Sequence, residues 1–275
     1  MAEGLLRRAR WDVRAFLMLA GMWTRVSWSY RTSFAVLTFA SLVTTFLDFA
    51  AILVMFANVP ALGGFGLAEI AFLYGTTSVS AGLADLVVGN VERLGQRIRL
   101  GSFDAMMVRP VGVLAQVCAD QFAMRRLGRV IQGAAVLGWA LAVVDVDWSV
   151  VRLVVLASML VCGALIFTAF FVLGASFQFV SIDGSEVANA FTYGGHTLVQ
   201  YPLTIYPRHL VTVLTFVLPV AFVNWYPALF VLGRPDPFGL PGWLRFASPL
   251  VALLLCALAG LAWRTGVRHY RSTGS

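Results

Sequence analysis

Long apolar stretches separated by short polar ones dominate the pattern along this chain. An α-helix needs about 20 mostly apolar residues to cross the hydrocarbon of a bilayer. Six stretches approach or exceed that length, at about residues 33–57, 65–88, 130–146, 150–180, 208–232 and 244–263. The pattern therefore predicts an all-α membrane protein with six transmembrane helices in a single domain over residues 1–275.

The N-terminal segment 7–31 has an amphipathic pattern instead of a continuous apolar one. Phe16, Trp23 and Tyr30 recur at helical spacing on one side, and the arginines fall near the opposite side. A helix of this kind lies in the membrane interface instead of crossing the bilayer. Asp12 is an exception, because it falls near the edge of the apolar side.

Small residues line one face of the second apolar stretch. They are Gly75, Ser78, Gly82, Asp85 and Gly89, at spacings that repeat with the helical turn. A face of small residues lets another helix approach closely in a membrane. We therefore expect another helix to pack closely here, assign Gly75, Gly82 and Asp85 to a substrate path or subunit seam, and expect Asp85 to point at protein or a wet cavity instead of lipid.

Two prolines interrupt the fifth apolar stretch. Proline removes a backbone donor and clashes with the preceding helical turn, so Pro219 and Pro227 divide the stretch into pieces that are short for a full crossing. Irregular backbone at membrane depth is tolerated only where protein or water satisfies it. The pattern predicts a kinked fifth helix from about Arg208, followed by a re-entrant or interfacial half-helix over 219–232. We interpret the polar, glycine-rich stretch 181–209 as a connection that returns to the membrane.

Residues 91–129 form the longest polar interruption and carry seven arginines. Lys and Arg in short loops tend to stay on the cytoplasmic side of a membrane. Placing this loop inside puts both termini inside as well, and it leaves only Arg152, Arg234 and Arg245 outside. The charge pattern therefore predicts a multi-pass protein with both termini in the cytoplasm.

Within this loop, residues 101–110 predict a short helix. Ser102 and Asp104 suit its first turn through capping and favourable charge, and Arg109 followed by Pro110 ends it. Its apolar side chains would form an exposed surface suited to a groove on another protein, and they are Phe103, Met106 and Met107. The alternative is a solvated loop that only fixes the topology.

Composition narrows the classes of chemistry available to the chain. It is 60% hydrophobic and 12% charged, and its net charge of +7 comes from arginines at the ends of apolar stretches instead of one basic face. A phosphate-binding loop of the form GxxxxGK[ST] is impossible because the sequence has no Lys. Motifs of the forms HExxH, CxxC and GxSxG are absent as well, so we expect no nucleotide, metal or cofactor site and no enzymatic activity in this chain.

Asp48 is the most prominent ionisable residue inside an apolar stretch. A charge at the centre of a membrane helix costs about 2.5 to 3.5 kcal/mol on insertion scales, so Asp48 requires a reason. It could line a substrate path or a subunit seam, or it could be protonated or paired for structural reasons, and the sequence leaves these alternatives open. Glu69 and Asp85 lie near the membrane edges, where snorkelling to the interface or an arginine partner explains them.

Four stretches of the sequence resemble one family of membrane proteins, and they are GSFDAMMVRPVGVLAQV, YPLTIYPRHL, LPVAFVNWYPALFVLG and HYRSTGS. They are similar to permease subunits of ABC-2 type exporters, and the resemblance covers nearly the whole chain. It implies six spans, an N-terminal elbow helix, a cytosolic coupling helix between spans 2 and 3, and re-entrant helices near the outer end of span 5. It also implies two permease subunits, identical or paralogous, assembled with two separate ATPase subunits that bind ATP and Mg²⁺.

The resemblance assigns roles to two short sets of residues. Coupling to the ATPase falls on Ser102, Phe103, Asp104, Met106, Met107, Arg109 and Pro110. The re-entrant role falls on Pro219, Asn224 and Pro227. No substrate-binding motif carries over.

The expected function is therefore that of a permease subunit of an ATP-driven exporter in a bacterial cytoplasmic membrane. Its substrate would be hydrophobic or amphipathic, such as a drug-like molecule or a lipid, because the path offers few charges. The alternative is an ion-coupled secondary transporter that needs no ATPase and uses Asp48 to bind the coupling proton. A third hypothesis, an intramembrane enzyme built on His196 and a nearby serine, lacks a nucleophile motif.

Overall fold

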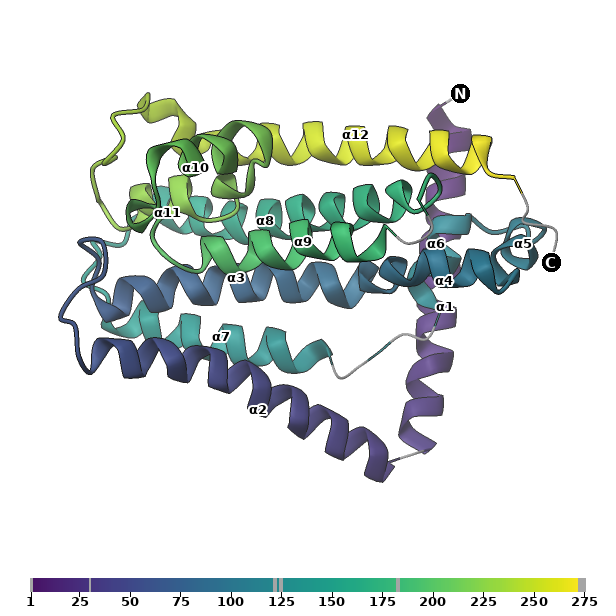
Figure 1. Cartoon of the computed structure of the whole chain (residues 1–275), viewed down its shortest axis with the longest axis horizontal. Coiled ribbons are helices and arrows are strands. Elements are labelled where there is room, and N and C mark those ends of the chain that lie inside the picture. Colours follow the sequence, from purple (N-terminus) through teal and green to yellow (C-terminus); the bar gives the residue numbers. More distant parts are fainter. Residues whose placement is uncertain (1, 30, 121–122, 124–125, 182–183, 272–275) are drawn as a thin grey trace.

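Helices that run roughly side by side form the body of the protein (Figure 1). The computed structural model describes residues 2–29, 31–120, 123, 126–181 and 184–271. The body consists of α2 (Arg31–Phe56), α3 (Leu67–Val88), α7 (Leu127–Val143), α8 (Val150–Phe177), α9 (Ser185–Val199) and α12 (Ser248–His269). Every regular element in the described part of the chain is helical, which confirms the predicted all-α fold class.

One end of this bundle carries the arginine-rich segment, and we call it the basic end. The segment folds into η1 (Gly89–Arg93), α4 (Leu94–Arg99), α5 (Ser102–Met107) and α6 (Val113–Ala119). Helix α1 (Ala2–Ser29) crosses the basic end roughly at right angles to the bundle, and the C-terminal end of α12 lies there as well (Figure 1). This crossing has the shape expected of an elbow helix, and its place in a membrane interface stays a prediction.

The structure supports fewer membrane spans than the six that the sequence predicts. Four helical segments of the described chain are long and apolar enough to cross a bilayer, or five if one bent pair counts as a span. The four are α2, the run Leu67–Arg99, α8 and α12. Helix α7 is also apolar but has only 17 residues. The total of six therefore stays a prediction.

Helix α3 is the centre of the packing. It contacts α7 and α8 along its length, and most of its side chains are buried. A Cβ atom added at Gly75 would lie 2.8 Å from the backbone of Leu137, and one at Gly133 would lie 2.8 Å from the Cβ of Ser78. A Cβ at Gly82 would similarly meet Val130 of α7 at 2.8 Å. The small-residue face of the second span therefore meets α7 at close range, as predicted.

The structure differs from the sequence prediction after α8. The polar stretch interpreted as a connection forms α9, which packs against α8 and α3 inside the bundle. Its residues looked like a loop because glycines and polar side chains such as His196 and Gln200 interrupt its apolar pattern. The expected kinked fifth helix is instead a bent pair at the end of the bundle opposite the basic end (Figure 1).

That bent pair turns by 79° between Arg208–Val217 and Val220–Val231. It comprises α10 (Arg208–Thr212), a π-helical turn η4 (Val213–Val217), η5 (Val220–Phe222) and α11 (Trp225–Val231), and short 3₁₀ turns flank it at η3 (Leu203–Ile205) and η6 (Gly242–Phe246). The break falls at Pro219, as predicted. Pro227 instead lies in the first turn of α11, where its missing N–H breaks no helical hydrogen bond.

Candidate functional site

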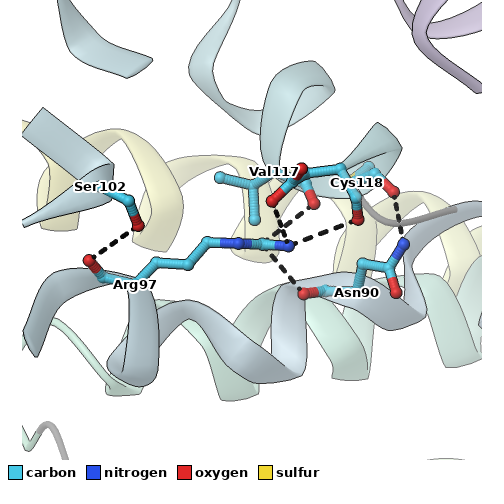
Figure 2. Close-up of polar contacts among 6 residues, drawn as sticks. Asn90, Arg97, Ser102, Val117 and Cys118 are labelled. Carbon is cyan, nitrogen blue, oxygen red and sulfur yellow. Dashed lines mark hydrogen bonds and ion pairs between the residues drawn. The ribbon is translucent and has the colours of Figure 1, made fainter. Parts of the chain in front are cut away.

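The buried guanidinium of Arg97 holds the segment η1 to α6 together. We call residues 89–119 the arginine-rich unit. Arg97 Nη1 donates to the carbonyl oxygens of Asn90 at 3.2 Å and Val117 at 3.1 Å (Figure 2). Its Nη2 forms an ion pair with Asp120 Oδ2 at 3.1 Å. Asn90 Nδ2 in turn donates to the carbonyl of Cys118 at 3.1 Å. Because one planar group satisfies acceptors on two helices, the unit is a folded body and not a solvated loop, and its coupling role stays a prediction.

Side-chain to backbone hydrogen bonds fix α5 inside this unit. Ser102 Oγ donates to the Arg97 carbonyl at 3.2 Å (Figure 2). Gln116 Nε2 donates to the carbonyl of Met106 at 3.0 Å and to that of Val111 at 2.9 Å. Gly101 makes the tight turn between α4 and α5 with a φ of 68°, a conformation that glycine adopts without strain.

The expectation that Phe103 and Met106 are exposed is wrong. Phe103 is 0% exposed and Met106 is 8% exposed. The Phe103 ring packs edge to face on Tyr270 at 4.9 Å and on Phe179 at 5.5 Å, and Phe179 packs on Trp263 at 5.3 Å. Burying a large aromatic ring against the chain's own core is more favourable than leaving it in water. These rings therefore tie α5 to the ends of α8 and α12.

Other apolar side chains of the unit do remain exposed. Leu100 is 71% exposed, Met107 41% and Val108 85%. They lie at the ends of α4 and α5, next to the exposed Arg109 and Pro110. An apolar surface that can meet a partner therefore exists at the predicted place, but Met107 is the only one of the three predicted side chains that contributes to it.

Hydrogen bonds also connect the unit to its neighbours. Asp12 Oδ1 of α1 accepts from the backbone N–H of Gly112 at 2.8 Å, just before α6. Gln178 Oε1, at the end of α8, accepts from the backbone N–H of Gly95 in α4 at 2.6 Å. Asp12 looked misplaced in the amphipathic pattern of the first helix, and this contact gives the reason.

Arginines neutralise the acids near the ends of α3. Asp85 Oδ1 lies 3.3 Å from Arg126 Nε, and its Oδ2 lies 3.6 Å from Arg129 Nη1. At the opposite end, Glu69 accepts two hydrogen bonds from Arg234, at 2.7 and 2.8 Å. Both acids have the arginine partners predicted from the sequence, and Asp85 points at protein.

A polar pocket of about 300 Å³ lies between α2, α3, α7 and α9. Its lining includes Asp48 of α2, Tyr74 of α3, Arg129 of α7 and His196 of α9. His196 and Gln200, whose polar side chains made the sequence of α9 resemble a loop, line this pocket. Sequence reasoning singled out Asp48 but missed the α9 residues, because their helical register was not recognised.

Asn224 anchors the bent pair to the bundle. Its Nδ2 lies 2.6 Å from Thr77 Oγ1 and 2.6 Å from the carbonyl of Val199. These contacts join the start of α11 to the middle of α3 and the end of α9. The Asn224 side chain therefore holds the bent pair against the bundle.

Comparison with known protein families decides the broad identity. A family model described as ABC-2 family transporter protein matches residues 42–274. The chain belongs to the ABC-2 transporter family. No curated protein and no solved structure matches it significantly.

Membership supports the interpretation of this ABC-2 protein as a multi-pass membrane permease, and it implies association with ABC ATPase subunits. The matched region includes the arginine-rich unit, the polar pocket and the bent pair. It begins inside α2, so α1 and Asp12 lie outside it.

Proposed function

We propose that this ABC-2 permease is the membrane subunit of an ATP-driven exporter of hydrophobic or amphipathic molecules, such as drug-like compounds or lipids. Two permease subunits, identical or paralogous, assemble with two copies of a separate ATPase in the cytoplasmic membrane of a bacterium. ATP and Mg²⁺ bind to the ATPase and not to this chain, which lacks the lysine of a phosphate-binding loop.

The observation that carries the proposal is the close packing of α5 against the C-terminal ends of α8 and α12. Leu100, Met107 and Val108 offer an apolar surface to the ATPase, while Phe103 on the same short unit is buried against Phe179 and Tyr270. Close-packed interiors transmit displacement instead of absorbing it. Closure of the ATPases on ATP therefore moves α5, and α8 and α12 move with it.

The orientation follows from the charge pattern. Cytosolic placement of the basic end puts the arginine-rich unit, the start of α2 and the end of α12 inside, in accord with the positive-inside rule. Both termini are then cytoplasmic. The bent pair around Asn224 lies at the outer end and is a re-entrant segment of the membrane domain.

Reconstitution tests this function. The permease is purified with the ATPase that accompanies it and inserted into liposomes loaded with a fluorescent hydrophobic dye. We expect ATP to drive dye movement, and we expect none with an ATPase whose catalytic glutamate is replaced. Dye movement by the permease alone, driven by a proton gradient, would overturn the proposal in favour of a secondary transporter.

That secondary transporter is the second candidate, and one observation favours it. Asp48 faces a polar pocket and has no ion-pair partner among the residues that the structure describes. A carboxyl group in this setting could carry a proton across the membrane. The gradient experiment separates the two candidates without any substitution in the chain.

A further inference from the structure

The carboxylate of Asp48 forms no ion pair with a residue that the structure describes. It lies on α2 about 12 Å from the end of the helix at Phe56, at 1.5 Å of rise per residue. Thr45, Asp48 and Ala51 are three residues apart and all line the polar pocket. Ionisable side chains inside membrane helices face protein or water-filled cavities and mark functional sites by default.

The cation nearest to the carboxylate in the pocket lining is already engaged elsewhere. Arg129 forms its ion pair with Asp85, and its guanidinium lies 5.9 Å from the ring centre of Tyr193. Arg126 shares Asp85, and Glu92 interacts electrostatically with both arginines. Arg129 also attracts the Asp48 carboxylate electrostatically, but Asp48 itself forms no ion pair with a described residue.

The rest of the lining suits a cation with an apolar body. Tyr74 and Tyr201 provide aromatic rings, which attract ammonium groups through their electron-rich faces, whereas the ring of Tyr193 already lies against Arg129. Gln200 lies 3.3 Å from the ring nitrogen Nε2 of His196 and adds a polar edge. The volume of about 300 Å³ is at the lower end for ligand pockets and fits a headgroup better than a whole drug-like molecule.

The surface beside the pocket is apolar. Leu47 is 61% exposed and Val54 is 66% exposed, and both lie on one flank of α2, about 100–120° around the helix from Asp48. An alkyl chain can therefore lie along α2 while its charged end enters the pocket. We propose that the pocket binds the positively charged head of an amphipathic amine, with Asp48 as its counter-ion. The proposal rests on the proposed transport function, and it names the class of substrate.

Equilibrium binding tests this inference on the permease–ATPase complex in phosphatidylcholine nanodiscs, with empty nanodiscs subtracted. The probes are radiolabelled dodecyltrimethylammonium and its neutral analogue dodecanol. In Asp48→Asn, we expect at least about a tenfold loss of affinity for the cation, because the ion pair with the ammonium group is lost, and no change for dodecanol. Asp48→Glu retains the charge and should stay within about threefold of the wild type. Asp145→Asn, in the exposed segment between α7 and α8, is the matched control and should bind both probes normally.

Several results would overturn the inference. They are unchanged cation affinity in Asp48→Asn, equal losses for both probes, and no cation binding by the wild type. Failure of Asp48→Asn to assemble into a permease pair would instead place Asp48 at a subunit seam. If ATP drives export of dodecanol but the cation does not bind, only this inference is overturned. If no transport depends on ATP, the proposed function is overturned.

Discussion

The ring of Phe103 lies edge to face on the ring of Tyr270, with 4.9 Å between ring centres. Phe103 belongs to a six-residue helix at the basic end, and Tyr270 follows the last residue of α12. The contact thus joins two segments that are far apart in the sequence. It makes the short helix α5 part of the core.

Replacement of Phe103 by alanine should destabilise the protein strongly. Removing a fully buried phenylalanine from a core costs about 3–5 kcal/mol, and Phe103 is 0% exposed. Thermal unfolding of the purified protein in detergent measures the loss. Met107→Ala, at a 41% exposed side chain on the same helix, is the control and should unfold near the wild-type temperature. Equal melting temperatures for the two variants would contradict the aromatic contact.

Charged residues at exposed positions of the unit should weaken ATPase association without unfolding the permease. Leu100→Asp and Val108→Asp place a carboxylate on the surface proposed to dock, where burying an unpaired charge is costly. We expect loss of co-purified ATPase with an unchanged melting temperature. Val150→Asp is the control, because Val150 is 77% exposed at the opposite end of the bundle. Full retention of the ATPase in both docking variants would refute the assignment.

The arginine-rich unit should loosen when Arg97 is replaced by methionine. The change leaves the carboxylate of Asp120 and the carbonyls of Asn90 and Val117 without their donor. We expect a cost of about 2–3 kcal/mol and faster hydrogen–deuterium exchange over residues 89–119. Arg264→Met, at an exposed position on α12, should leave exchange in that region unchanged. Wild-type exchange in Arg97→Met would show that the network is not needed.

Cys118 should react slowly with maleimide in the folded protein. Burial raises the pKa of its thiol to about 12, so little thiolate exists at neutral pH. The folded pKa lies above that of a free thiol, so this group stabilises the folded state fully below about pH 8.5 and progressively less as pH rises toward 12. Mass spectrometry after labelling at pH 7.5 measures the modification. Arg97→Met should speed labelling of Cys118, and rapid labelling of the folded wild type would contradict its burial.

Close packing between α3 and α7 predicts that alanine substitution lowers stability at one glycine of this pair of helices but not at another. Gly75→Ala places a methyl group 2.8 Å from the Leu137 backbone and should cost about 1–3 kcal/mol through overpacking. Gly138→Ala, on α7, meets no atom within 4 Å and should be neutral or slightly stabilising, because alanine favours helix more than glycine does. Thermal unfolding of both variants in the same detergent gives the comparison.

The sequence predicted the features that depend on local pattern. The long apolar runs, the break at Pro219, the small-residue face around Gly75 and the arginine partners of Asp85 could all be anticipated. Each follows from spacing along one helix or from the cost of an unpaired charge in an apolar setting. The position of the short helix α5 was also predicted, but the predicted cap is wrong: Gly101 is the N-cap residue, and the Ser102 hydroxyl donates to the Arg97 carbonyl instead.

The tertiary structure alone decided which faces are covered. A short amphipathic helix offers Phe103 equally well to a partner protein or to its own core, and only the nearby Phe179 and Tyr270 settle the choice. The same holds for α9. Its polar side chains are typical of a loop in the sequence, but in the structure they line a polar pocket formed with α2 and α3. Burial depends on contacts between residues that are far apart in sequence, and no local pattern along the chain contains that information.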